Sequence, residues 1–149
     1  MKKIFSILVL GLLWGGMASA KPTYLECVFD YDTTTFKDGK VQNTDSKSIV
    51  TKPGNEFFLI DVAKKKLVQI RTNADDLVFN NVIWTSDKIE WDVIYSKSQG
   101  ALNHSEINKY SEKYKSTTTY NRNSSTYKIF NIQSSVYNYN CSQKDASIK

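Results

Sequence analysis

Lys88-Ile-Glu-Trp-Asp-Val-Ile-Tyr95 is the stretch that decides the fold class, because apolar and polar side chains alternate more clearly there than elsewhere in the chain. Such alternation is typical of a β-strand with one buried face, since successive side chains point to opposite sides. The side chains expected to face the core are Ile89, Trp91, Val93 and Tyr95. Those expected to face outward are Glu90, Asp92 and Ile94.

Similar short segments lie on both sides of this stretch and are separated by turn signals. Residues 23–31 alternate with Cys27 on the inner face, and Asp38-Gly39 supplies positive φ angles for a two-residue hairpin turn. Residues 73–81 are expected to form a loop. The flanks of the Asp38-Gly39 turn, 33–37 and 40–44, are polar and are expected to form a hairpin flap rather than core, and 48–51 is a short β-favouring run. The sequence predicts further strands at 56–61, 67–72, 82–85, 114–121, 125–132 and 135–141.

Residues 96–113 do not show this alternation. Ile107, Tyr110 and Tyr114 have helical spacing, so we expect a loop with one short helix there. Short strands joined by tight turns, without helices alternating between them, favour an all-β fold. The sequence therefore predicts an antiparallel sandwich or barrel of about eight short strands with at most one short helix, forming a single domain over residues 21–149.

Residues 1–20 have the features of a secretory signal peptide. Lys2 and Lys3 precede an apolar run over residues 4–14, and Ala18-Ser-Ala20 supplies small residues for cleavage. The run is shorter than the roughly 20 residues that a membrane-spanning helix needs. We expect cleavage after Ala20, a periplasmic or secreted protein, and no membrane span in the remaining chain.

The chain has two cysteines, Cys27 near the expected new N-terminus and Cys141 near the C-terminus. A pair of cysteines in an exported protein predicts a disulfide. Closing so long a loop would stabilise the fold by ~4–5 kcal/mol in the chain-entropy description. The bond would also tie the first strand of the sheet to the last.

Few residues are candidates for chemistry. Glu90 and Asp92 lie on one face of one strand, and paired carboxylates are what glycoside hydrolysis requires. The solvated outer face of a strand carries the same pattern. His104 is the only histidine and is expected in an exposed loop, and a disulfide would occupy both cysteines. We therefore expect no catalytic residue, no metal ligand and no cofactor, and a protein that is not an enzyme.

The remaining charged and aromatic residues have structural interpretations. Asp30 and Asp32, like Asp75-Asp76, do not match a calcium-binding loop, and Lys64-Lys65-Lys66 fits a solvated turn. The formal net charge of +5 falls once the signal peptide is removed and is too small to predict nucleic-acid binding. The aromatic side chains expected in the core rather than in a ligand cup are Trp91, Tyr95, Tyr137 and Tyr139.

Three different short motifs are spread over most of the mature chain: Tyr24-Leu-Glu-Cys27, Phe58-Leu-Ile-Asp61 with its Lys-rich turn to Leu67-Val68, and Tyr120-Asn-Arg122 with the final Tyr139-Asn-Cys141. Together they resemble small uncharacterised exported β-domain proteins of bacteria that have an N-terminal and a C-terminal cysteine. This resemblance implies no activity. The size and cysteine pattern are also similar to those of periplasmic lysozyme inhibitors, small β-barrels whose Ser-Gly-rich inhibitory loop has only Asn123-Ser-Ser125 as a counterpart here.

The sequence thus favours an exported binding or envelope-associated domain without enzymatic activity. Its partner would be a small apolar ligand or an envelope protein. A periplasmic inhibitor of a lysozyme-like enzyme is one alternative. A small hydrolase that uses Glu90 and Asp92 is the other.

Overall fold

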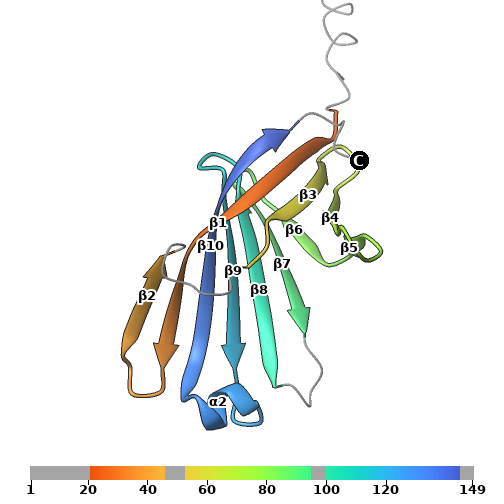
Figure 1. Ribbon diagram of the computed structural model, residues 1–149. Helices are drawn as coiled ribbons and strands as arrows, with labels where there is room; N and C mark the ends of the chain where they lie inside the picture. Colours follow the sequence, from red (N-terminus) through yellow and green to blue (C-terminus); the bar gives the residue numbers. More distant parts are fainter. Residues whose placement is uncertain (1–20, 46–52, 95–99, 145–149) are drawn as a thin grey trace, which may run out of the picture.

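The structure, a computed structural model, describes residues 21–45, 53–94 and 100–144 (Figure 1). In these ranges it contains ten antiparallel strands and one short helix, so the predicted all-β class is confirmed. The elements are β1 (Thr23–Phe36), β2 (Val41–Asp45), β3 (Glu56–Asp61), β4 (Lys66–Ile70), β5 (Leu77–Phe79), β6 (Val82–Trp84), β7 (Lys88–Ile94), β8 (Ala101–Asn108), β9 (Lys113–Tyr120), α2 (Ser125–Ile129) and β10 (Ile132–Lys144).

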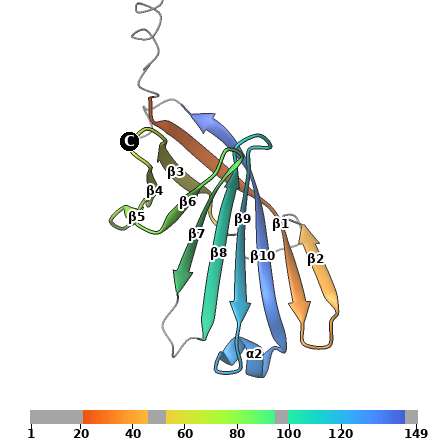
Figure 2. The same cartoon turned by 180° about the vertical axis from the view of Figure 1, so that it is seen from behind.

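All strands belong to one sheet with the order β5-β4-β3-β1-β10-β9-β8-β7-β6, and β2 pairs with β1 off this path. The two ends of the path, β5 and β6, are joined in the chain by Asn80 and Asn81 alone. The sheet therefore curls round into a nearly closed barrel, which decides between the two predicted architectures (Figures 1 and 2). The first and last strands, β1 and β10, lie side by side.

The core fills the inside of the barrel with aromatic and aliphatic side chains. Phe58 is at its centre, with its ring centroid 5.6 Å from that of Trp91 and 5.0 Å from that of Tyr114. Each fully buried large side chain stabilises the fold by ~1.5–3 kcal/mol. Tyr137 packs against this core, and the remaining members of the core are Leu25, Cys27, Phe29, Ile60, Leu67, Ile89, Ile107, Tyr139 and Cys141. The predicted inner face of the stretch at 88–95 is confirmed for Ile89 and Trp91, and Tyr95 lies outside the described residues.

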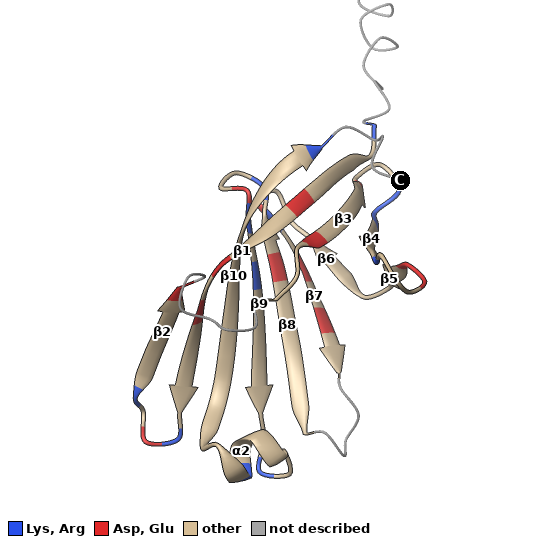
Figure 3. Ribbon diagram, in the orientation of Figure 1, with Lys and Arg blue, Asp and Glu red and all other residues tan. Residues whose placement is uncertain are grey.

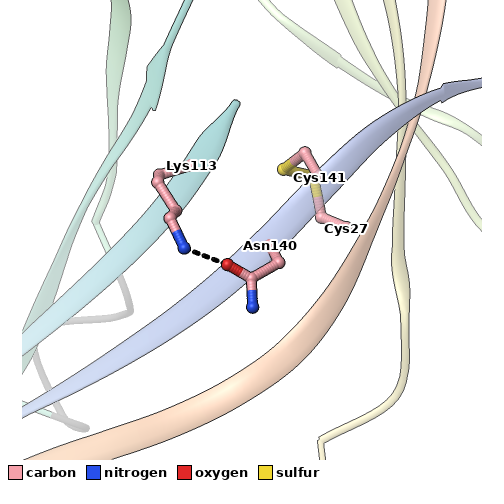
Figure 4. Close-up of a disulfide and its surroundings, with 4 residues drawn as sticks. All are labelled: Cys27, Lys113, Asn140 and Cys141. Carbon is pink, nitrogen blue, oxygen red and sulfur yellow. Dashed lines mark hydrogen bonds between the residues drawn. A yellow bond between two sulfur atoms is a disulfide. The ribbon is translucent and has the colours of Figure 1, made fainter. Parts of the chain in front are cut away.

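The predicted disulfide is present. Cys27 on β1 and Cys141 on β10 are direct register partners, and their sulfur atoms are 2.06 Å apart (Figure 4). Both cysteines are buried on the inner face. On the other side of β10, the Lys113 ammonium donates a hydrogen bond to the Asn140 side-chain oxygen. The disulfide joins β1, the first strand in the chain, to β10, the last, as the sequence predicts.

The prediction of a loop with a short helix over residues 96–113 is wrong for the described part, which contains strand β8. Ile107 and Tyr114 are direct partners across the β8–β9 hairpin, and Tyr110 lies exposed in the turn between them. The Asn108 side-chain oxygen accepts hydrogen bonds from the backbone N–H groups of Tyr110 and Ser111, which stabilises this turn. The helical spacing thus arises from a hairpin whose two strands both bury an apolar residue.

The helix lies instead at Ser125–Ile129, where the sequence predicts a strand at 125–132. The chain turns directly after β9, where the Asn121 carbonyl accepts a hydrogen bond from the Ser124 N–H at 3.0 Å. Because β9 and β10 pair with each other, the two ends of the connection between them lie close together, and backbone groups within it bond to one another. At the two ends of the helix, the Lys128 N–H donates to the carbonyl of the N-cap residue Ser124 at 3.1 Å, and the N–H of the C-cap residue Phe130 donates to the Thr126 carbonyl at 3.1 Å.

Three smaller predictions are corrected. The segments at 23–31 and 33–37 form one strand, β1, with an irregularity between Phe29 and Tyr31. The Phe36 N–H bonds the Lys40 carbonyl at 2.9 Å and only Gly39 has a positive φ there, so the turn spans residues 37–39 and is not the two-residue type. The expected loop at 73–81 contains β5, which pairs with β4. The short β-favouring run at 48–51 lies outside the described residues.

Candidate functional site

An apolar cleft opens on the outer face of the barrel over β1, β3 and β4. Leu25 and Phe58 point into the core, so their chain neighbours Tyr24 and Phe57 stand on the outer face. Ile70 is the register partner of Phe57 on β4 and extends the same surface. The cleft has a volume of about 480 Å³ and is lined by Tyr24, Leu25, Phe57, Ile70, Arg71, Thr72, Asp76 and Lys144.

Two cations stand at the edge of this cleft. The Arg71 side chain is held in place because its Nε–H donates to the Asp75 carbonyl at 2.8 Å. The Lys144 ammonium lies 2.9 Å from a Glu26 carboxylate oxygen, and hydrogen bonds from Lys144 and Asn55 lower the pKa of Glu26. The cleft therefore combines an apolar wall with the Arg71 guanidinium and a Lys144 ammonium that is paired with Glu26, and Asp76 also lines it. Its volume lies within the range of small-molecule sites, ~300–1,000 Å³.

The sequence did not predict a ligand site at these residues. The signal was the doublet Phe57-Phe58, because adjacent aromatic residues on one strand point to opposite faces. Phe58 is buried at 1% exposure, which leaves Phe57 on the outer surface. Asp76, weighed for calcium, lines the cleft instead, and its carboxylate accepts a hydrogen bond from the Arg71 backbone N–H at 3.2 Å.

A second cluster lies on β7 and β8 and brings together several residues considered from the sequence. Glu90 and Asp92 stand on one face of β7, as predicted. His104 is on β8 and not in a loop, because it pairs directly with Asp92. Its Nδ1 atom lies 2.8 Å from an Asp92 oxygen, and its Nε2 atom lies 3.6 Å from a Glu90 oxygen. Glu106, the direct partner of Glu90, was not considered and completes the cluster.

Lysine side chains accompany these acids. The Lys88 ammonium is 2.8 Å from Glu90 and 3.8 Å from Glu106, and its hydrogen bond to Glu90 raises the pKa of Lys88. Lys115 on β9 is 3.9 Å from Glu106. Figure 3 shows the acidic positions on β7 and β8 beside the basic positions on β9. Each carboxylate considered for hydrolysis thus faces a cation or the imidazole: Glu90 faces Lys88, and Asp92 faces His104.

The other sequence candidates are not brought together. Asp30 lines a cleft with residues of β8, β9 and β10, whereas Asp32 pairs with Tyr137. One Asp32 carboxylate oxygen is buried without a partner among the described residues, and the other accepts a hydrogen bond from Thr34 at 3.2 Å. Lys64 reaches Asp61 at 3.6 Å from the exposed β3–β4 turn, which fits the predicted solvated turn.

The segment compared with an inhibitory loop, residues 123–125, leads from the turn after β9 into α2. Asn123 and Ser125 are exposed, Ser124 is 2% exposed, and Ser125 is the first residue of the helix. Within the described ranges, no helix has the length and apolar character needed to cross a membrane.

Comparison of the chain with models of protein families, with curated proteins and with solved structures gives no match. The cleft and the charged cluster are therefore the features from which function is inferred.

Proposed function

We propose that this protein is an exported binding protein, without enzymatic activity, that holds a small amphipathic anion in the cleft over β1, β3 and β4. The ligand class is an apolar molecule with one acidic group. Export is supported by the N-terminal pattern of lysines, an apolar run and small residues. The intramolecular disulfide is compatible with an extracellular or periplasmic location.

The observation that carries this proposal is the pairing of an apolar wall with two cations. Tyr24, Phe57 and Ile70 supply a surface from which an apolar chain or ring displaces water. Arg71 is suited to an acid group, because guanidinium binds carboxylates through paired hydrogen bonds. Its Nε–H is already used by Asp75, which fixes the side chain and leaves the Nη donors for a ligand.

The test is a fluorescence titration of the disulfide-bonded protein with a dansyl-labelled fatty acid and with its methyl ester. We expect saturable binding of the acid and weaker binding of the ester. Arg71→Gln should weaken binding of the acid about 10–100-fold, which corresponds to the loss of one charge-assisted hydrogen bond, and should leave binding of the ester unchanged. Ile70→Ser should weaken binding of both probes, because it removes part of the apolar wall.

Val78→Ser is the matched control, since Val78 is an exposed β5 residue that does not line the cleft. It should bind both probes like the unaltered protein. Absence of saturable binding, or equal losses in Val78→Ser and Ile70→Ser, would overturn the proposed function.

A second candidate function, association with the cell envelope, is favoured by the opposite end of the barrel. Ile129 and Phe130 are adjacent and 68% and 62% exposed. Lys128 precedes them, and Lys37 lies nearby with its ammonium 3.9 Å from the centre of the Tyr127 ring. Apolar side chains surrounded by lysines bind anionic lipid surfaces, where each lysine contributes ~1 kcal/mol.

Co-sedimentation with phospholipid vesicles tests this second candidate. We expect binding to vesicles that contain phosphatidylglycerol and none to pure phosphatidylcholine. The Ile129→Ser/Phe130→Ser double variant should lose binding, and Ile83→Ser, a change at an exposed β6 residue, should keep it. Equal sedimentation with and without vesicles would exclude a lipid partner.

A further inference from the structure

The charged cluster on β7 and β8 contains a set of metal-ligand atoms. Glu90, His104 and Glu106 each offer one ligand atom, and these atoms lie within 4.8 Å of one another. Zinc ligands in a tetrahedral site lie about 3.4 Å apart at bond lengths of ~2.1 Å. Small side-chain rotations from the paired strands would therefore bring all three atoms into coordination distance.

Asp92 prepares His104 for this role. The Asp92 carboxylate lies 2.8 Å from Nδ1. A carboxylate at this position favours the tautomer with the proton on Nδ1, in which Nε2 carries the lone pair that a metal ion needs. Nε2 is the atom that lies on the Glu90 side, at 3.6 Å. A carboxylate behind a histidine in this way orients the imidazole and increases its basicity toward a metal ion.

The strand register explains why the cluster attracts a cation. Glu90 and Glu106 are direct cross-strand partners, and like charges in that position destabilise a sheet. In the structure Lys88 relieves this repulsion, with its ammonium 2.8 Å from Glu90 and 3.8 Å from Glu106. A divalent ion between the same two carboxylates would relieve it more strongly and would compete with Lys88 for Glu90.

We propose that Glu90, His104 and Glu106 bind a divalent transition-metal ion, with Zn²⁺ as the best match, and that Lys88 is the internal cation that the metal displaces. An imidazole with two carboxylates suits zinc and its neighbours in the first transition series. Calcium and magnesium prefer sites made of oxygen ligands alone. Three protein ligands leave one zinc position for water. The site lies on β7 and β8, apart from the cleft over β1, β3 and β4, so it does not depend on the proposed ligand.

Isothermal titration of the untagged, disulfide-bonded protein with zinc chloride and then with calcium chloride tests the proposal. We expect one zinc ion per chain and no calcium binding. His104→Gln and Glu106→Gln should weaken zinc binding at least about 10-fold, and Asp92→Asn should weaken it about 10–100-fold through the orientation of His104. Glu112→Gln, a change in the exposed β8–β9 turn, is the control and should bind zinc normally.

Lys88→Gln separates a metal site from a set of ion pairs that only joins the strands. A metal site predicts tighter zinc binding in this variant, because the competing ammonium is gone, and a melting temperature that zinc raises. Ion pairs with a purely structural role predict a lower melting temperature that zinc does not restore. The proposal is overturned if the protein binds no zinc, if His104→Gln binds it as well as the unaltered chain does, or if Lys88→Gln does not bind it more tightly.

Discussion

Cys27 and Cys141 are direct partners across β1 and β10, with their Cα atoms 3.9 Å apart, so the disulfide joins the first strand in the chain to the last in the middle of the sheet, whose two ends are β5 and β6. Reducing this bond should lower the melting temperature, at a cost of ~2–5 kcal/mol of unfolding free energy, because the unfolded chain regains the freedom that the bond removes. Circular dichroism melts with and without a reductant measure the change.

The Cys27→Ala/Cys141→Ala double variant is the control for reduction. It should melt near the reduced protein and show no response to the reductant. An oxidised and a reduced protein that melt together would contradict a stabilising role for the bond.

Phe58 is the centre of the aromatic core, 1% exposed and in contact with the rings of Trp91 and Tyr114. Phe58→Ala should lower the free energy of unfolding in guanidinium by ~3–5 kcal/mol. The variant loses buried apolar surface, and the neighbouring rings cannot fill the cavity that remains. Val78→Ala, at a half-exposed outer position, should cost less than ~1 kcal/mol. Similar losses in both variants would mean that Phe58 is not packed as described.

Much of the fold could be predicted because the alternation of apolar and polar residues along a strand reflects which side chains are buried. At residues 88–95 one face of the strand meets the core, and the sequence therefore separates Ile89 and Trp91 from Glu90 and Asp92 correctly. The disulfide follows from cysteine count and expected export, without any knowledge of the strands. These signals are local, or depend on the chain as a whole, and do not require strand register.

Both candidate sites depend on register, which no local pattern contains. His104 meets Asp92 only because β8 pairs with β7 in one particular alignment, and the helical spacing of Ile107 and Tyr114 concealed β8. The cleft likewise joins Tyr24, Phe57 and Ile70 from three strands. Alternation shows which side of a strand a residue faces, but not which residues of other strands stand beside it.

Gly100 and Gly39 have positive φ angles of +60° and +81°, but their surroundings differ. A Cβ at Gly100 would collide with the Asn121 side chain and lie 2.8 Å from the Ser124 backbone nitrogen, whereas a Cβ at Gly39 meets nothing within 4 Å. Gly39→Ala should therefore cost ~1 kcal/mol through backbone conformation alone. Gly100→Ala adds a clash that costs a further ~1–3 kcal/mol. Urea unfolding of the two variants measures the difference, and equal losses would mean that the turn after β9 has room for a methyl group.

Burial raises the pKa of both Tyr137 and Tyr139 in the folded protein. A raised pKa means that folding favours the neutral phenol, so this contribution to stability is fully present below the unfolded value of ~10 and is lost as the pH rises above it. We expect alkaline unfolding in which these two phenols ionise together with the loss of the β-sheet signal. Absorbance at about 295 nm and circular dichroism, recorded together from about pH 9 upward, follow the two events.

Tyr137→Phe removes one of these ionisations and should move the unfolding transition to higher pH. Tyr110→Phe, at a position that is 78% exposed, should leave the transition unchanged. If all tyrosines ionise in a single step near pH 10 while the β-sheet signal persists, Tyr137 and Tyr139 are accessible to solvent in the folded barrel, and the packing described for them is wrong.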